Sequence, residues 1–152
     1  MLESNKQSTF SRTHHIFDSF EGLSSPSGKD GQYWTEGDLS IGVDVVKNNL
    51  SEFDRVKIYK GWIPDRFKEV SNHTFSFVHV DVDLHAPTLE SVMFFYDRLN
   101  VGGIFVCDDY GFLTCPGATA AIQEFLHEKP EKMVSLPGGG GFFIKGCVTS
   151  AE

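Results

Sequence analysis

Two stretches decide the fold of this chain: Phe77-Val-His-Val-Asp81-Val-Asp83-Leu-His85 and Gly102-Gly-Ile-Phe-Val-Cys-Asp108-Asp109-Tyr110. In each, a short apolar run is followed at once by acidic residues. Such a run is typical of a buried β-strand, and the segment between the two has helical spacing. Two strands joined by a helical crossover run parallel and end at the same edge of the sheet. We therefore predict that the four aspartates meet at one edge.

The rest of the chain alternates strands with helices. Strands are expected at 15–18, 55–60, 75–80, 104–107, 133–136 and 141–147, and helices at 39–50 (capped by Asp38), 64–70, 88–99 and 117–128. Residues 1–14 are expected to be irregular or the remnant of a helix. This order predicts an α/β, three-layer, Rossmann-like sandwich. Its mostly parallel sheet ends in an antiparallel hairpin, and residues 1–152 form a single domain.

Composition excludes several classes of protein. The 152 residues are 40% hydrophobic, which suits one compact core. No apolar run approaches the roughly 20 residues of a membrane helix, and the start has no signal-peptide pattern, so we expect a cytoplasmic protein without membrane contact. The net charge of −8 argues against a nucleic-acid partner. The three cysteines, Cys107, Cys115 and Cys147, fit no disulfide framework and are expected to be reduced, mostly buried thiols.

The acidic residues are the candidates for a metal site. A single aspartate after a strand is commonly a turn residue. Asp81, Asp108 and Asp109 at adjacent strand ends would repel one another unless a cation or a proton intervenes. Oxygen ligands favour Mg²⁺, with Ca²⁺ as the alternative, and the cation would lower the pKa of a bound substrate hydroxyl. Asp83 and His85 are the candidates for accepting that proton, although a loop histidine is more often a surface residue.

Other polar or aromatic positions leave two interpretations open. Asp18 ends the first strand, where an acid either holds ribose hydroxyls or closes a loop. Tyr33 and Trp34 either stack on a ligand or anchor their loop in the core. His79 is expected to be a packed core histidine. The glycines at 138–141 precede a strand instead of a helix, which favours a turn over a phosphate-binding loop.

Several short motifs, taken in order, resemble the macrocin O-methyltransferase family, whose members methylate sugar hydroxyls of macrolide and aminocoumarin antibiotics. The resemblance runs from about residue 15 to 146. The motifs are Phe17-Asp-Ser-Phe-Glu-Gly-Leu23, Lys60-Gly-Trp62, Val80-Asp-Val-Asp-Leu84 with Thr88, Leu99-Asn-Val-Gly-Gly103, and Cys107-Asp-Asp-Tyr-Gly111 followed by Cys115-Pro-Gly-Ala118.

The resemblance implies a class I methyltransferase fold that uses S-adenosylmethionine and Mg²⁺ to methylate a small-molecule hydroxyl acceptor. By resemblance, Asp81, Asp108 and Asp109 are the metal ligands, and Asp83 is the general base, with His85 as a further catalytic candidate. The cofactor is expected to contact five residues of the same edge, which are Asp18, Ser19, Gly61, Trp62 and Asp81.

The sequence departs from the family pattern at its start. The family's first strand and its glycine-rich turn should precede Phe17, and the 16 residues there show no such pattern, so the domain is expected to be truncated. That strand belongs between the strands ending at Asp18 and Asp81. Without it we expect unpaired backbone groups, flanking strands forced together, or another chain in the gap, a homo-oligomer included.

Three functions follow from these observations. The first is an S-adenosylmethionine- and Mg²⁺-dependent O-methyltransferase domain acting on a sugar or another small natural product. The second is an inactive remnant that binds a metal or a partner chain. The third is a metal-dependent hydrolase in which the acids activate water.

Overall fold

The strands form two separate sheets in the computed structural model, which describes residues 1–148. In the smaller sheet, β1 (His14–Asp18) pairs in parallel with β2 (Val56–Lys60). The larger sheet has the order β3-β4-β6-β5, and its strands are β3 (Phe75–Val80), β4 (Leu99–Cys107), β6 (Gly141–Ile144) and β5 (Val134–Ser135). β3 and β4 are parallel, whereas β6 is antiparallel to β4 and to β5. The expected parallel sheet with a closing antiparallel hairpin is confirmed.

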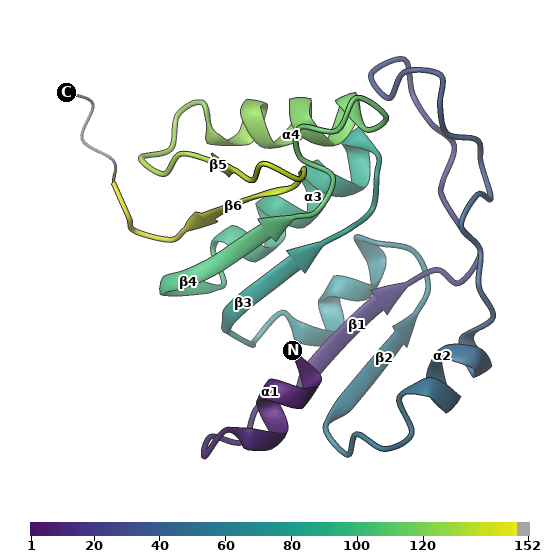
Figure 1. The fold of residues 1–152 in the computed structure, drawn as a ribbon, viewed down its shortest axis with the longest axis vertical. Helices are drawn as coiled ribbons and strands as arrows, with labels where there is room; N and C mark the ends of the chain where they lie inside the picture. Colours follow the sequence, from purple (N-terminus) through teal and green to yellow (C-terminus); the bar gives the residue numbers. More distant parts are fainter. Residues whose placement is uncertain (149–152) are drawn as a thin grey trace.

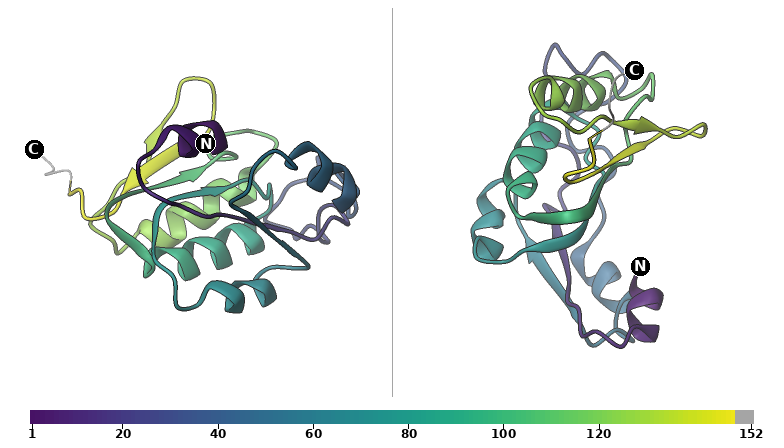
Figure 2. Two further views of the ribbon diagram at one scale, coloured as in Figure 1. Left: turned by 90° about the horizontal axis from the view of Figure 1, so that it is seen from below. Right: turned by 90° about the vertical axis from the view of Figure 1, so that its left-hand side faces the viewer.

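Helices lie on both sides of the strands (Figure 2). The 3₁₀ helix η1 (Asp65–Val70), α3 (His85–Tyr96) and α4 (Pro116–Leu126) are on one side. The short helices α1 (Leu2–Gln7) and α2 (Val43–Asn49) are on the other. The layered α/β arrangement is therefore the expected one. Among residues 1–148, none of the helices combines the length and apolar composition that crossing a membrane requires.

The two sheets are separated by a gap between β1 and β3. All four strands from β1 to β4 point in the same direction, but β1 and β3 are not paired with each other (Figure 1). A cavity of about 1210 Å³ lies between them, lined by residues 13–17 and 75–80. Closure of the flanking strands onto each other was one of the expected consequences of a missing strand. β1 and β3 have not closed together in this way.

The core lies between the larger sheet and the two long helices. Val92 of α3 and Ile122 of α4 are fully buried, and they face a sheet in which Phe105 is fully buried too. Phe95 extends the core toward the smaller sheet, where its ring lies 6.1 Å from that of Phe17. None of the residues of β1 or β2 is buried, so the smaller sheet has much the weaker packing.

The boundaries of several elements differ from the sequence expectation, most clearly those of the helix expected at 39–50 and of β4. The helix expected from residue 39 begins only at Val43, and Gly42 precedes it. Asp38 does not cap it, because its carboxylate accepts a hydrogen bond from the Thr35 N–H instead. β4 was expected from residue 104, but it begins at Leu99 and continues through Gly102 and Gly103. Gly102 adopts a φ of +80° there, beside an irregularity in the strand register.

The glycines at 138–141 form the turn between β5 and β6, as expected. The Leu136 N–H donates to the Gly140 carbonyl at 3.0 Å, and the Gly139 N–H donates to the Leu136 carbonyl at 3.1 Å. Both bonds close the connection locally. Residues 141–144 then pair with β4, so the segment leads from one strand into another.

Candidate functional site

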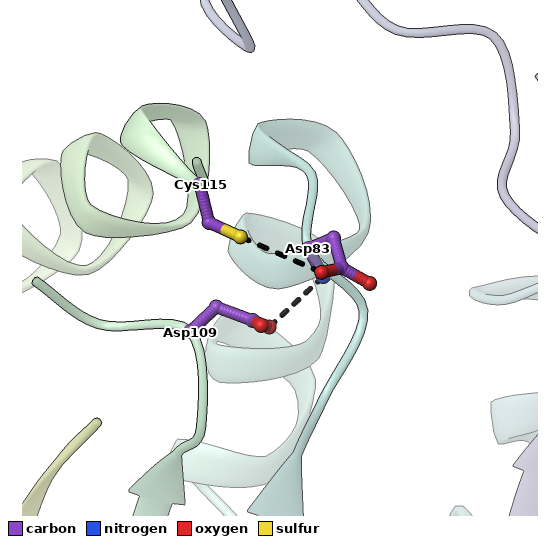
Figure 3. Close-up of side chains that lie close together, drawn as sticks. All are labelled: Asp83, Asp109 and Cys115. Atoms are coloured by element: carbon purple, nitrogen blue, oxygen red, sulfur yellow. Dashed lines mark hydrogen bonds between the residues drawn. The ribbon is translucent and has the colours of Figure 1, made fainter. Parts of the chain in front are cut away.

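Three residues of the family motifs lie together where β3 and β4 end: Asp83 after β3, Asp109 after β4, and Cys115 before α4 (Figure 3). Asp109 accepts hydrogen bonds on one carboxylate oxygen from the N–H groups of Val82 (3.1 Å) and Asp83 (2.9 Å). The Cys115 thiol donates to the Asp83 carboxylate at 3.4 Å. Within residues 1–148, this buried trio is the group whose possible metal-ligand atoms all lie within 4.8 Å of one another.

Asp83 has both an unusual backbone and an unusual proton affinity. Its φ of +60° lies in the left-handed region, which aspartate tolerates better than most residues. Burial raises the pKa of its carboxyl to about 6, the nearby Asp109 charge adds to the rise, and the Cys115 thiol partly opposes it. Perturbed carboxylates in such positions are frequent at functional sites. Asp83 is therefore suited to exchanging a proton near neutral pH.

Asp81 and Asp108 lie at the same edge but outside this trio. The Asp81 side chain reaches solvent, yet the surrounding protein desolvates it and raises its pKa, with further contributions from Asp109 and Asp108. Asp108 is exposed, and its carboxylate lies 3.2 Å from the His79 Nε2. The expectation that His79 belongs to the core is wrong, because its side chain is exposed at this edge.

These carboxylates are chemically suited to a hard cation. Asp81, Asp108 and Asp109 offer oxygen ligands only, which is the donor set that Mg²⁺ and Ca²⁺ prefer. Burial is the main cause of the raised Asp81 pKa, and the nearby Asp109 and Asp108 charges add to it; a cation among these carboxylates would offset their mutual repulsion.

His85 is buried, so the expectation of a surface histidine is wrong. Its Nε2 atom lies 3.0 Å from the Lys29 Nζ and 3.2 Å from the Glu124 carboxylate. The imidazole therefore joins the loop before α2 to helix α4. Its polar partners are Lys29 and Glu124, whereas those of Asp83 are Asp109, after β4, and Cys115, before α4.

Sequence reasoning missed Asp30, a buried acid in the loop after β1. Its carboxylate accepts hydrogen bonds from the Ser27 N–H (2.7 Å), the Ser27 hydroxyl (2.6 Å) and the His85 N–H (2.6 Å). Burial opposes its ionisation, but these hydrogen bonds outweigh burial and lower its pKa. Asp30 thus caps the first residue of α3. A Cβ atom at Gly117 would overlap the Asp30 carboxylate, so this position requires glycine. The glycine of the Cys115-Pro-Gly motif was therefore the one sign in the sequence that another group packs closely there.

The predicted cofactor residues at the end of β1 form a tight turn. Asp18 accepts a hydrogen bond on one carboxylate oxygen from the Phe20 N–H at 2.6 Å. The Ser19 hydroxyl donates to the Gly22 carbonyl at 3.0 Å and accepts from the Glu21 N–H. Asp18 therefore closes the loop, as one of its two interpretations expected, while its second oxygen has no hydrogen bond from residues 1–148.

Gly61 and Trp62 follow β2 beside that turn. The Gly61 N–H donates to the Asp18 carbonyl at 2.9 Å, and its φ of +135° favours glycine. A Cβ atom there would also lie 2.9 Å from the Arg66 side chain. The Trp62 side chain is 42% exposed, which leaves part of its surface free for contact with a ligand.

The two aromatic residues of the loop differ in their surroundings. The Trp34 indole N–H donates to the Cys115 sulfur at 3.4 Å, and the ring packs against the core. Trp34 is therefore an anchor of the loop. Tyr33 is 64% exposed and stands edge-on to Trp34. The cysteines agree with expectation, since Cys107 and Cys115 are buried free thiols and Cys147 is an exposed one.

Comparison with known proteins gives consistent matches. A model of the macrocin O-methyltransferase family matches residues 2–137. Demethyldecarbamoylnovobiocin O-methyltransferase of Streptomyces niveus is 26% identical in an alignment of 126 positions, which covers 75% of this chain and 47% of that protein. The chain therefore spans about half the length of this curated relative.

Solved structures agree in fold. The calicheamicin methyltransferase CalS11 superposes with a TM-score of 0.76 at 20% identity, over 90% of this chain and 61% of that chain. The O-methyltransferase NovP superposes with a TM-score of 0.71 at 21% identity, over 95% of this chain and 63% of that chain. These likenesses show the class I methyltransferase fold. Because the family model covers most of its residues, the chain belongs to the macrocin O-methyltransferase family.

Proposed function

We propose that this chain carries the metal- and acceptor-binding edge of an S-adenosylmethionine- and Mg²⁺-dependent O-methyltransferase, whose acceptor is a hydroxyl of a sugar or another small natural product. The observation that carries the proposal is the buried Asp83 at the common end of β3 and β4, whose N–H donates to Asp109 and whose carboxylate accepts from Cys115. Family membership supports the reaction class.

Asp81, Asp108 and Asp109 are the residues that would hold Mg²⁺. When bound, the cation supplies positive charge that lowers the pKa of the acceptor hydroxyl. The three carboxylates come from the ends of two neighbouring strands, and the Asp108 N–H donates to the Val80 carbonyl at 2.9 Å. This bond fixes the two strand ends relative to each other.

Asp83 would accept the proton of the acceptor hydroxyl. Its N–H is fixed by Asp109 and its carboxylate by Cys115, so the side chain is oriented before any substrate arrives. Asp18 and Ser19, with Gly61 and Trp62 beside them, would hold the cofactor at the end of β1. The unbonded oxygen of Asp18 is suited to a ribose hydroxyl.

The metal assignment is tested by calorimetric titration of the chain with MgCl₂. The double variant Asp108→Asn with Asp109→Asn should lose Mg²⁺ binding, because two anionic ligands become neutral amides. An asparagine at 109 still offers an oxygen to the N–H groups of Val82 and Asp83, so the fold should be kept.

A matched control is the double variant Asp44→Asn with Asp54→Asn, which removes the same charge from exposed positions. It should bind Mg²⁺ as the unmodified chain does. Unchanged affinity in the Asp108 and Asp109 variant, with circular dichroism showing a folded protein, would refute the metal site.

A further inference from the structure

The proposed function leaves open which residues hold the body of the acceptor, meaning everything except the reacting hydroxyl. Asp83 would accept the proton of that hydroxyl, but Asp83, Asp109 and Cys115 are all buried, and their possible ligand atoms lie within 4.8 Å of one another. No sugar ring fits among them. The body of the acceptor must therefore contact the chain segments next to this trio, at the carboxyl ends of the strands, where ligands of such sheets bind.

Two segments border the trio. Residues 110–114 connect Asp109 directly to Cys115. Residues 30–34 reach it through the Trp34 indole N–H, which donates to the Cys115 sulfur at 3.4 Å. The thiol of Cys115 in turn donates to the Asp83 carboxylate at 3.4 Å. Both segments thus meet at the residue whose side chain contacts the proposed base.

Backbone hydrogen bonds hold residues 110–114 in place. The Phe112 N–H donates to the Asp109 carbonyl at 3.3 Å, and the Cys115 N–H donates to the Phe112 carbonyl at 3.1 Å. The second bond closes a β-turn in which Leu113 is the first central residue. The Leu113 side chain is 98% exposed, so it adds almost nothing to the packing of the turn. Its position is fixed by the backbone, and its surface is free.

Residues 30–34 are fixed at both ends. At one end, the buried Asp30 carboxylate accepts a hydrogen bond from the first N–H of α3. At the other end, the Trp34 ring packs against the core. Tyr33 precedes Trp34 and is largely exposed, and its ring stands edge-on to the Trp34 ring at a centroid distance of 4.8 Å. Trp34 therefore supports the Tyr33 ring on one side and leaves most of it free.

Tyr33 and Leu113 are the apolar side chains of these two segments that remain free. The other aromatic residues of the segments pack against the core or against the glycine turn between β5 and β6; they are Trp34, Tyr110 and Phe112. A single exposed apolar residue is common on a protein surface. Two of them, on separate fixed segments that meet beside the proposed base, indicate a surface that binds an apolar part of a ligand.

We propose that Tyr33 and Leu113 are specificity-determining residues that contact the body of the acceptor. They favour an acceptor that carries an apolar group, aliphatic or aromatic, next to the methylated hydroxyl, over one that is polar on all sides. This assignment rests on the proposed function, because the hydroxyl at Asp83 sets where the body of the acceptor lies. Apolar contacts can provide such a preference, since one small apolar group changes discrimination by roughly tenfold or more.

The probes are the β-glucoside, β-galactoside and β-xyloside of 4-methylumbelliferone, in which an aromatic group stands next to the sugar hydroxyls. Each is compared with the corresponding methyl glycoside, which lacks the aromatic group. Binding to the full chain with MgCl₂ is measured by NMR, which gives the affinity and the shifts of the Tyr33 ring and Leu113 methyl signals. The variants are Tyr33→Ala, Tyr33→Phe and Leu113→Ala. Met93→Ala is the matched control, because Met93 is an exposed apolar residue on α3.

We expect saturable binding of at least one aromatic glycoside, with shifts at both side chains, and at least about tenfold weaker binding of its methyl counterpart. Tyr33→Ala and Leu113→Ala should each weaken binding of the aromatic glycoside by roughly tenfold. Tyr33→Phe keeps the ring, so this variant and Met93→Ala should bind as the unmodified chain does. Unchanged affinity in either alanine variant, equal affinity for the methyl glycosides, or no binding of any of the three probes would overturn the proposal.

Methyl transfer from S-adenosylmethionine to the bound glycoside is measured separately, so that the reaction and the two contacts can fail independently. Binding that depends on Tyr33 and Leu113 without methyl transfer would count against the proposed reaction and leave the two contacts standing. Methyl transfer with an unchanged KM for the glycoside in both alanine variants would overturn the contacts and leave the reaction standing.

Discussion

Asp83 combines a left-handed backbone, burial and an adjacent negative charge in one residue. Burial and the adjacent charge make an ionised Asp83 unfavourable in the folded protein, and the positive φ adds backbone strain. Asp83 therefore does not serve the stability of the fold. Backbone strain and raised carboxyl pKa values concentrate at functional sites, so a role in catalysis explains this residue better.

Stability should therefore depend on pH through Asp83. Its pKa is about 6 in the folded protein against the ordinary 3.8, so the folded state binds the extra proton between these values. Stability consequently falls as pH rises from 3.8 to 6 and stays lower above 6, by up to roughly 3 kcal/mol. Asp83→Asn should raise the free energy of unfolding of the metal-free chain at pH 8 and flatten this pH dependence, as measured by urea unfolding.

Asparagine also tolerates a positive φ, so the substitution adds no backbone strain. The control Asp54→Asn, at an exposed turn, should change neither the stability nor its pH dependence. If Asp83→Asn left stability unchanged at pH 8, or lowered it, burial of the charge would not be the dominant effect at this residue.

The thiol of Cys115 should tune the proton affinity of Asp83. Its hydrogen bond at 3.4 Å favours the ionised carboxylate and so opposes the effect of burial. In Cys115→Ala the Asp83 pKa should rise above about 6, whereas Cys115→Ser keeps a donor and should restore it toward the original value. NMR titration of the Asp83 carboxyl carbon measures both, and a lower pKa in Cys115→Ala would contradict this role.

At the scale of elements, α3 begins where it does because of a residue far away in the sequence. The helix was expected from residue 88, and it starts at His85. Leu84 precedes it and provides no side-chain cap, so the first N–H of α3 is bound by Asp30 of the loop after β1. The negative charge also complements the positive end of the helix dipole. The loop and the helix therefore stabilise each other.

Asp30→Ala should lower the free energy of unfolding by about 1–2 kcal/mol, because it removes the cap of α3 together with the two bonds to Ser27. Thermal unfolding compared with the exposed Asp54→Ala variant checks this. Since the Asp30 pKa is lowered on folding, its contribution is present above pH 3.8 and is lost as pH falls through the folded pKa. An equal effect of the two variants would contradict the capping role.

The sequence predicted those elements whose signals are local. Acidic residues at the ends of apolar runs correctly marked the edge where Asp83 and Asp109 meet, and the glycines at 138–141 correctly marked a turn. The surroundings of His79, His85 and Asp30 could not be predicted, because they depend on contacts between distant parts of the chain. Asp30, for instance, binds a helix 55 residues further on. Only tertiary structure brings such partners together.

At the scale of the whole molecule, the chain consists of a well-packed sheet and a weakly packed one. The larger sheet contains the fully buried Phe105 and Phe143, whereas no residue of β1 or β2 is buried. The cavity between β1 and β3 separates the two sheets. Asp18, at the end of β1, and Asp81, after β3, therefore lie on units with different packing.

This difference should appear in native-state hydrogen exchange. The ladder amides of β2, such as Tyr59, should open with a lower free energy than the ladder amides of β4, such as Val106. Equal opening energies for the two ladders in the chain alone would show that it unfolds as one cooperative unit.

The central claim is that the aspartates after β3 and β4 and the turn after β1 together form a methyltransferase site. It is tested most directly by calorimetric titration of the full chain with S-adenosylhomocysteine, with and without Mg²⁺, beside the variant Asp18→Asn. Asparagine can still accept the Phe20 N–H, so this variant removes the charge and keeps the turn. We predict saturable binding with unit stoichiometry that is weakened in Asp18→Asn. No binding under either condition, with Mg²⁺ still taken up, would contradict the claim and leave a metal-binding member of the family that does not bind the cofactor.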